Sequence, residues 1–246
     1  MTLDLWAKTS GTWINVGTVL AGTSLGLLLH NRLPFRMQQI LTQGIGLLTL
    51  WLGLSMASKL AEVRAGQVDG AILGLLAIAL GGLLGETSQI EERLTRLGDW
   101  LKHRFQGTGR FTEGFVASSL LFCVGPMTLL GCLNNGLTGD NTVLMLKAVM
   151  DGIAAIAFTS TYGIGVGCSS LVILVFQGGL SLAAATLTAL LPSPATDPRI
   201  WLITGVGGLM VLGVGLNLLE VTKVRVASFL PALAIAPLLY WLATQI

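Results

Sequence analysis

The sequence predicts an all-α protein that crosses a membrane with a bundle of about eight helices. Hydrophobic residues make up 53% of the 246, and charged residues only 11%, which is about half the share in a soluble domain. The mean hydropathy is +0.79. The apolar residues gather into runs of about 20, the length that crosses a hydrocarbon core of about 30 Å. Together these observations predict a polytopic transmembrane bundle.

Eight apolar runs are the expected spans, and we take residues 1–246 as a single integral membrane domain. The fifth and sixth runs are nearly continuous around Tyr162 and Gly163, so a count of seven stays open. The first run lacks a basic leader and precedes a second span directly, so we expect it to remain in the mature chain. The runs cover residues 12–30, 37–58, 70–86, 114–135, 142–161, 163–191, 200–219 and 226–245.

The basic residues predict the orientation, because cytoplasmic loops of membrane proteins retain Lys and Arg. With eight crossings, one side would hold Lys8, Lys59, Arg64 and Arg199. We therefore expect a bacterial inner-membrane protein with both termini outside the cytoplasm. The cytoplasmic side would hold Arg32, Arg36, Arg93, Arg96, Lys102, Arg104, Arg110, Lys223 and Arg225.

Residues 87–109 form the one sizeable polar segment, "TSQIEERLTRLGDWLKHRFQGTG". Ser88 and Glu91 have the spacing of a capping box. The apolar residues fall on one stripe opposite a charged face, which predicts an amphipathic helix on the cytoplasmic membrane surface. Such a helix serves either as a simple connector or as a lipid sensor. The stripe comprises Ile90, Leu94, Leu97, Trp100, Leu101 and Phe105.

Two pairs of spans show internal similarity. "GLLTLWLGLSM" (46–56) aligns with "GLMVLGVGLNL" (208–218), and "LGLLAIA" (73–79) aligns with "LPALAIA" (230–236). Chance matches are common among Leu, Gly and Ala, so both a repeat and a coincidence stay open. In a repeat, spans two and three would pair with seven and eight. That odd offset would make the copies inverted, an arrangement typical of secondary transporters.

The fourth run contains its own helix breaker, in "FCVGPMTLLGCLNN" (122–135). Pro126 cannot donate to the carbonyl of Phe122, and Gly125 allows close backbone approach, so we expect a kinked or unwound span. In lipid, the freed carbonyls need partners such as other helices, hydroxyls or a water-filled cavity. The break is therefore either a packing kink or part of a binding element.

The fifth run places Lys147 and Asp151 four residues apart on one helical face. Charged groups inside a membrane are costly and usually face a partner or a pathway. The same helix carries Thr159, Ser160 and Thr161 toward its far end, although small polar residues also serve helix packing. We interpret the pair as part of a pathway, with helix packing as the alternative.

These features give a set of candidate pathway residues and exclude other kinds of site. Cys123, Cys132 and Cys168 fall within spans and are expected to be packing residues. We see no catalytic motif, metal cluster or nucleotide motif, so we expect neither an enzyme nor a cofactor. The candidate solute or ion pathway residues are Asn15, Gly125, Pro126, Thr128, Asn134, Asp140, Lys147, Asp151, Thr159, Ser160, Thr161 and Asn217.

Four stretches carry a resemblance to a known family: "GTWINVGTVLAGTSLG", "ASSLLFCVGPMTLLGCLNNGLTGD", "LKAVMDGIAAIAFTSTYGIGVGCSSL" and "GLNLLEVTKVRVASFLPALAIAPLL". Together they resemble the YqgA/YdfK-like family of bacterial inner-membrane proteins, over essentially the whole chain. The resemblance implies a polytopic membrane protein without an established substrate. It transfers no catalytic or binding residues.

The expected function is secondary transport of a small solute or ion. The alternatives are a channel, or a membrane protein that transports nothing and acts as a scaffold or contacts lipid. The expected partners are membrane lipid and an unidentified solute or ion, and a homo-oligomer stays open. The formal net charge of +2 is too small to indicate nucleic acid.

Overall fold

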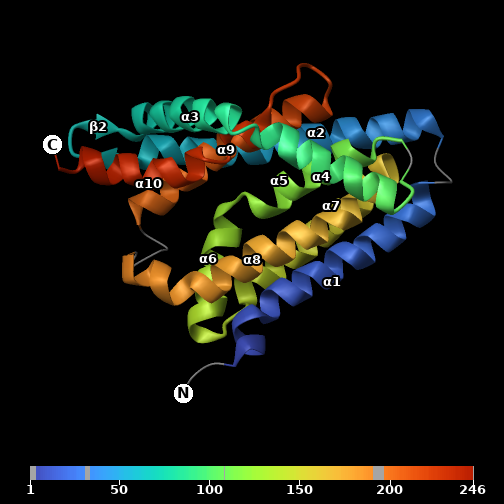
Figure 1. Ribbon diagram of the computed structural model, residues 1–246, viewed down its shortest axis with the longest axis horizontal. Helices are drawn as coiled ribbons and strands as arrows, with labels where there is room; N and C mark the ends of the chain where they lie inside the picture. Colours follow the sequence, from blue (N-terminus) through green and yellow to red (C-terminus); the bar gives the residue numbers. More distant parts are fainter. Residues whose placement is uncertain (1–3, 31–33, 108, 191–196, 246) are drawn as a thin grey trace. The chain divides into compact units, whose positions relative to one another are not determined.

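The computed structural model describes residues 4–30, 34–107, 109–190 and 197–245, and these are mostly helical (Figure 1). The predicted all-α membrane bundle is confirmed. The helices are α1 (Leu5–His30), α2 (Phe35–Ala57), α3 (Gly70–Thr87), α4 (Ile90–Arg104), α5 (Phe111–Cys123), α6 (Pro126–Thr138), α7 (Thr142–Tyr162), α8 (Gly165–Leu190), α9 (Pro198–Leu218) and α10 (Ala232–Ala243).

Seven helical stretches of the described residues are long and apolar enough to cross a membrane, and the count is eight if α5 and α6 form one span. The seven overlap seven of the expected runs. The eighth run, 114–135, falls on α5 and α6, which are separated by Val124 and Gly125 and differ by 61° in direction. The break expected in the sequence thus lies where one helix ends and the next begins.

Short elements join some of the long helices. Two 3₁₀ helices, η1 (Ser58–Glu62) and η2 (Val226–Phe229), precede α3 and α10. The strands β1 (Arg64–Ala65) and β2 (Val68–Asp69) form an antiparallel hairpin between α2 and α3, with Arg64 opposite Asp69. The sequence did not predict this hairpin, because two-residue strands leave no alternating pattern.

The chain divides into two compact units. Unit 1 comprises residues 1–45 and 96–193, and unit 2 comprises residues 46–95 and 194–246. Unit 1 contains α1, α5, α6, α7 and α8, and unit 2 contains α3, α9, α10 and the end of α2.

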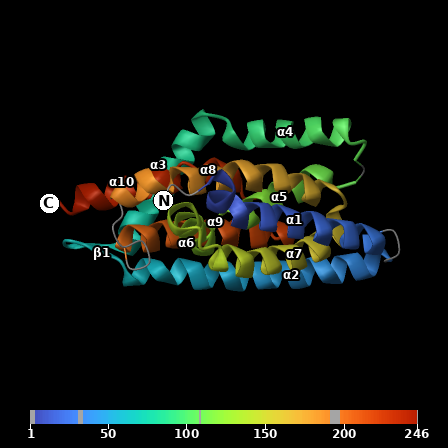
Figure 2. The same ribbon diagram turned by 90° about the horizontal axis from the view of Figure 1, so that it is seen from below.

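The helix directions in unit 1 follow from its close contacts. α1 runs parallel to α7, because Gly11 lies against Leu144 and Gly26 against Ile156. It runs antiparallel to α8, where Thr23 meets Gly167 and Thr12 approaches Gly178. Both ribbon views show α1 beside these helices (Figures 1 and 2).

α5 and α6 together follow α8 in the same direction. Phe111, at the start of α5, lies against Gly165, and Gly136, near the end of α6, lies against Ser181 and Ala184. The helices α1, α6, α7 and α8 all pack against one another. Residues on their facing sides therefore share one interior.

Two antiparallel contacts in unit 2 show its helix directions. α2 packs on α9 through Gly46 with Leu219 and Gly53 with Leu212, and α3 packs on the segment leading into α10 at Gly81 and Gly85. A β-carbon on Gly85 would overlap the Ser228 carbonyl, so only glycine permits this approach. The core is apolar: Leu60, Val63, Ala65, Leu73, Ala77, Leu202, Val206, Ala232, Ala236 and Ala243.

Large apolar side chains cover the outer faces of the helices. On α7, Leu146, Val149 and Ile153 follow a helical stripe and are 58 to 64% exposed. An apolar exterior suits hydrocarbon, which solvates such side chains as well as a protein core does.

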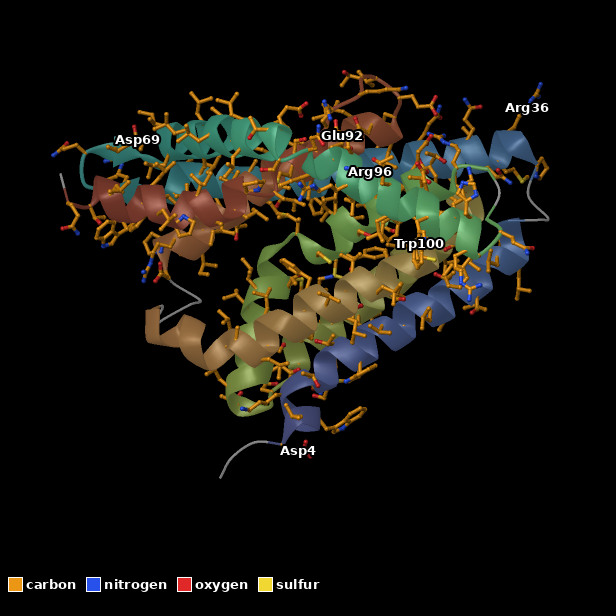
Figure 3. The ribbon with its side chains drawn as sticks, in the orientation of Figure 1. Asp4, Arg36, Asp69, Glu92, Arg96 and Trp100 are labelled. Carbon is orange, nitrogen blue, oxygen red and sulfur yellow. The ribbon has the colours of Figure 1, made fainter. Side chains whose placement is uncertain are left out.

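The expected amphipathic helix corresponds to α4. Gly98 and Leu101 are buried, and Gly98 packs on Thr112 of α5. Glu92, Arg96 and Trp100 follow one another along α4 (Figure 3), and Trp100 is mostly exposed. Contact of this helix with the membrane surface stays a prediction.

Candidate functional site in unit 1

A buried ion pair lies at the centre of the candidate site. Lys147 and Asp151, one turn apart on α7, form an ion pair, and their side chains are only 8% and 11% exposed. The same carboxylate oxygen, Asp151 Oδ2, accepts a hydrogen bond of 2.9 Å from Asn15 Nδ2 of α1. The parallel packing of α1 and α7 thus brings Asn15 to Asp151.

The pair lies near the middle of its helix. Asp151 is close to the midpoint of α7 (Thr142–Tyr162). Gly125, in the break, is likewise midway between the start of α5 and the end of α6. In a helix that crosses a bilayer, these positions correspond to the midplane.

Contacts with Leu144 show which residues of α1, α6 and α7 lie at similar positions along the bundle axis. Gly11 of α1 and Gly131 of α6 both pack on Leu144. One turn deeper along α1 and α7 come Asn15 and Lys147. α6 runs opposite to α7, since it follows α8, so one turn deeper on α6 is Thr128.

α8 contributes to the same level. Thr12, one turn before Asn15, approaches Gly178, so the neighbouring Gln177 lies at this depth. Thr12, Asn15, Thr128 and Gln177 are each 0% exposed. We call Thr12, Asn15, Thr128, Lys147, Asp151 and Gln177 the polar layer of unit 1.

Many polar atoms of this layer have no hydrogen-bond partner among the described residues. They are Thr12 Oγ1, Asn15 Oδ1, Thr128 Oγ1 and both polar atoms of the Gln177 amide. Ser119 Oγ on α5 is also buried without a hydrogen-bond partner among the described residues. Buried polar groups are almost always satisfied, and leaving one unsatisfied costs about 1–3 kcal/mol. Such a concentration indicates a place for water or a ligand.

The break between α5 and α6 adds backbone groups. Val124 N–H donates to Leu120 O, which closes α5, and Leu129 N–H donates to Gly125 O, 3.3 Å, in the first turn of α6. Pro126 occupies the first turn and has no N–H. The end of α5 presents carbonyls and the start of α6 a positive dipole end. Partial negative and partial positive charges therefore both occur midway along the α5–α6 segment.

The three hydroxyl residues at the end of α7 lie apart from the layer. Thr159 Oγ1 is 3.5 Å from Thr23 Oγ1, and Ser160 Oγ donates to Ala157 O at 2.7 Å. Thr161 Oγ1 lies 3.5 Å from Gln38 O. These contacts tie α7 to itself, to α1 and to the start of α2, and the role of these residues in a pathway stays a prediction.

Asn134 is exposed on α6, whereas its neighbour Asn135 is fully buried. Asn135 Oδ1 accepts from Gly11 N–H at 3.0 Å, and its Nδ2 donates to Ala7 O at 2.9 Å, which fixes α6 to the start of α1. Sequence reasoning missed Asn135. A signal was present, because residue 135 is two turns after Thr128 on the same helical face.

The remaining two candidates occupy turns. Asp140 is exposed before α7, and hydrogen bonds from the Thr142 hydroxyl and backbone N–H hold the pKa of its carboxyl below the usual range. Asn217 belongs to unit 2, where its amide exchanges two hydrogen bonds of 2.7 Å with the backbone of Val224. Neither residue reaches the polar layer.

Metal ligation of the usual kind has no basis in the described part of the chain. It contains no group of three or more His, Cys, Asp or Glu residues that could hold a metal ion. Cys123, Cys132 and Cys168 are free and buried.

Comparison with known proteins identifies the family. The family described as "Protein of unknown function (DUF554)" matches residues 10–241. The chain belongs to this family. It is 30% identical over 227 residues to "Uncharacterized membrane protein YdfK" of Bacillus subtilis (strain 168), covering 92% of this chain and 93% of the relative.

A second relative extends the comparison. The chain is 32% identical over 233 residues to "Uncharacterized protein YqgA" of Escherichia coli (strain K12), covering 92% of this chain and 94% of the relative. No solved structure matches the chain. The resemblance noted in the sequence is thus confirmed, and the chain is a helical membrane protein of a family without an assigned function.

Proposed function

We propose that this protein is a secondary transporter that moves a small solute or ion through the polar layer of unit 1. The observation that carries the proposal is the set of unpartnered buried polar atoms in the same layer as the Lys147–Asp151 pair, about halfway along the helices of unit 1. Burying polar and charged groups inside a membrane is costly, so the groups that occur there usually line a pathway for a solute, an ion or a proton.

The α5–α6 segment is proposed to cross the membrane once, as a broken span. It follows α8 from Phe111 at Gly165 to Gly136 at Ala184, a distance of about 28 Å along α8 at 1.5 Å per residue. A re-entrant loop would turn back before covering that length. The parallel packing of α1 and α7 also requires an odd number of crossings between them, which α2, α3 and one α5–α6 span provide.

This count supports eight crossings with both termini on one side. The distribution of Lys and Arg supports an orientation with that side outside the cytoplasm. The break between α5 and α6 would then lie at the membrane midplane, where many secondary transporters bind substrates between the two halves of a discontinuous helix.

Antiparallel helix pairs support an inverted repeat. The sequence alignment sets Gly53 over Gly215 and Leu50 over Leu212. In the structure Gly53 packs on Leu212, and Leu50 packs on Gly215. Each glycine therefore meets the leucine of the other copy, as a two-fold relation demands.

Unit 1 contains a similar pair. α1 and α8 are antiparallel, and "GTSL" (22–25) aligns with "GLSL" (179–182) at nearly the same sequence offset. An inverted repeat of α1–α3 and α8–α10 accounts for both pairs. Such repeats are the usual basis of alternating access.

Burial favours a carrier over a channel. Every residue of the polar layer is at most 8% exposed, so the layer is almost fully covered by protein. A carrier needs a site that is closed at one stage of its cycle, whereas an open pore keeps its lining wet.

The test is a flux measurement in proteoliposomes on wild type and Pro126→Ala. Concentration jumps of Na⁺, K⁺, H⁺, chloride, phosphate and a neutral amino acid serve as probes. We expect a saturable flux for at least one probe, and its loss in Pro126→Ala with folding intact, because the alanine restores a continuous helix. Pro237→Ala within α10 of unit 2 is the matched control and should keep the flux.

The proposal fails if wild type gives no saturable flux for any of these probes. It fails as well if Pro126→Ala transports as wild type does, since the break would then be a packing kink.

A further inference from the structure

We propose that the polar layer binds a dehydrated monovalent metal cation on Asp151, and that the Lys147 ammonium holds this cation's place in the structure described. The inference rests on the proposed function and names the ligand of the same site.

The first argument is the type of atom left without a partner. Asn15 turns its amide nitrogen to Asp151, so its carbonyl oxygen remains an acceptor without a donor. The Gln177 carbonyl oxygen and the hydroxyls of Thr12 and Thr128 are also unpartnered. Neutral oxygens near one carboxylate are the ligands that hard cations prefer.

The second argument is charge balance. Asp151 carries one negative charge, and Lys147 supplies one positive charge to it. A monovalent cation at the carboxylate supplies the same charge once the ammonium swings on its flexible stem toward the start of α7, five residues away, where water can compensate it. A divalent cation would leave a net positive charge on the carboxylate, and an anion would leave Asp151 uncompensated. Unpaired charge in a low-dielectric interior is strongly unfavourable.

The third argument is space. Thr12, Asn15, Thr128 and Gln177 are fully buried, which leaves the layer closed to a hydrated ion. A cation entering it must exchange water for protein oxygens, and the unpartnered acceptors lie in the same layer as Asp151, with Asn15 in direct contact with its carboxylate. Ammonium and cation contact the same carboxylate, so their binding is mutually exclusive.

The experiment uses the full-length protein in detergent and measures thermal unfolding of wild type and Lys147→Met. Unfolding is followed in lithium, sodium, potassium and N-methylglucamine chloride at equal ionic strength. We expect Lys147→Met to melt lower than wild type in the N-methylglucamine salt and to be restored by at least one alkali cation. Its apparent Kd for that cation should be about tenfold or more below the wild-type value, because the competing ammonium is gone.

Two variants serve as controls. The double change Lys147→Met with Asp151→Asn removes the carboxylate and should abolish the cation response. Lys59→Met removes a lysine of unit 2 from an exposed ion pair with Glu62, and its melting should respond to the four salts as wild type does, without the roughly tenfold gain in cation affinity.

Equal melting of Lys147→Met in all four salts overturns the proposal and leaves ordered water as the partner of these side chains. If Lys147→Met cannot be purified, wild-type titration decides: a saturable rise with one alkali cation supports binding, and a flat response overturns it. Cation binding without flux would uphold this inference and refute the transporter, whereas flux of another probe without a cation response would do the reverse.

Discussion

Units 1 and 2 use the same packing method but fill their interiors differently. In both, glycines bring helices into backbone contact, as at Gly22 with Gly152 and at Gly85 with Ser228. The hydrophobic core cluster of unit 2 is built from Leu, Val and Ala, whereas most of the buried polar side chains of the described residues belong to unit 1. Close packing is therefore a general solution for lipid, and the polar interior is the feature specific to unit 1.

The two units also differ in where they hold charge. Unit 2 keeps its ion pairs at helix ends and turns, as between Arg199 and Asp197 and between Arg225 and Glu86. Burial raises the pKa of Glu91, whose carboxylate accepts a hydrogen bond from Ala227 N–H at 2.7 Å. Unit 1 holds Lys147 and Asp151 at mid-helix, where only a partner or a ligand can compensate them.

The largest expected effect tests the shared packing. Gly22→Val and Gly85→Val place side-chain atoms on a backbone carbonyl that cannot move away. Each should lower the free energy of unfolding by about 3 kcal/mol or more, seen as loss of a monodisperse peak in detergent chromatography. Gly17→Ala is the control, since a β-carbon there meets nothing within 4 Å. Tolerance of one valine but not the other would show that the units do not pack alike.

The next effect is confined to unit 1. Lys147→Met leaves the buried Asp151 carboxylate without its counter-ion, and Asp151→Asn does the same to the Lys147 ammonium. Each should therefore lower the free energy of unfolding by roughly 3–5 kcal/mol. The double variant leaves nothing unpaired and should recover most of that loss. Thermal unfolding in detergent without alkali cations measures all three. Two single variants as stable as wild type would place both groups in bulk water.

How far the sequence predicts the structure differs between the units. Span positions follow from apolar runs, because crossing a bilayer requires length and hydrophobicity, which are local properties. The Lys147–Asp151 contact was also predictable, since residues four apart share a helical face. Asn15 as their third partner depends on which helix packs beside α7, and no local pattern contains that information.

Register explains what was missed in the rest of the site. Gln177 lies in an apolar run and became part of the site only through the packing of α8 on α1. Asn135 rather than Asn134 is buried, because one residue rotates a side chain by about 100° around the helix. Asn217 aligns with Ser55 in the sequence but hydrogen-bonds Val224 in a turn, a role that depends on the chain path after α9.

The smallest effect compares one hydroxyl in each unit. Thr204 of unit 2 and Thr128 of unit 1 are both buried with an unpartnered Oγ1. Thr204→Val removes a hydroxyl that nothing satisfies, so it should raise the free energy of unfolding by about 1 kcal/mol. For a chain of this size that corresponds to a rise of roughly 2–4 °C in the melting temperature, with flux unchanged.

Thr128→Val should behave differently, because its hydroxyl faces the polar layer. If an ion or water contacts this oxygen during transport, the valine forfeits that contact, and we expect no gain in melting temperature together with a reduced flux in proteoliposomes. The paired measurement separates the two interiors by function, since both substitutions remove the same atom from an equally buried position. A stabilising Thr128→Val with full flux would make the hydroxyl of unit 1 equivalent to that of unit 2, and the polar layer would then be a packing feature.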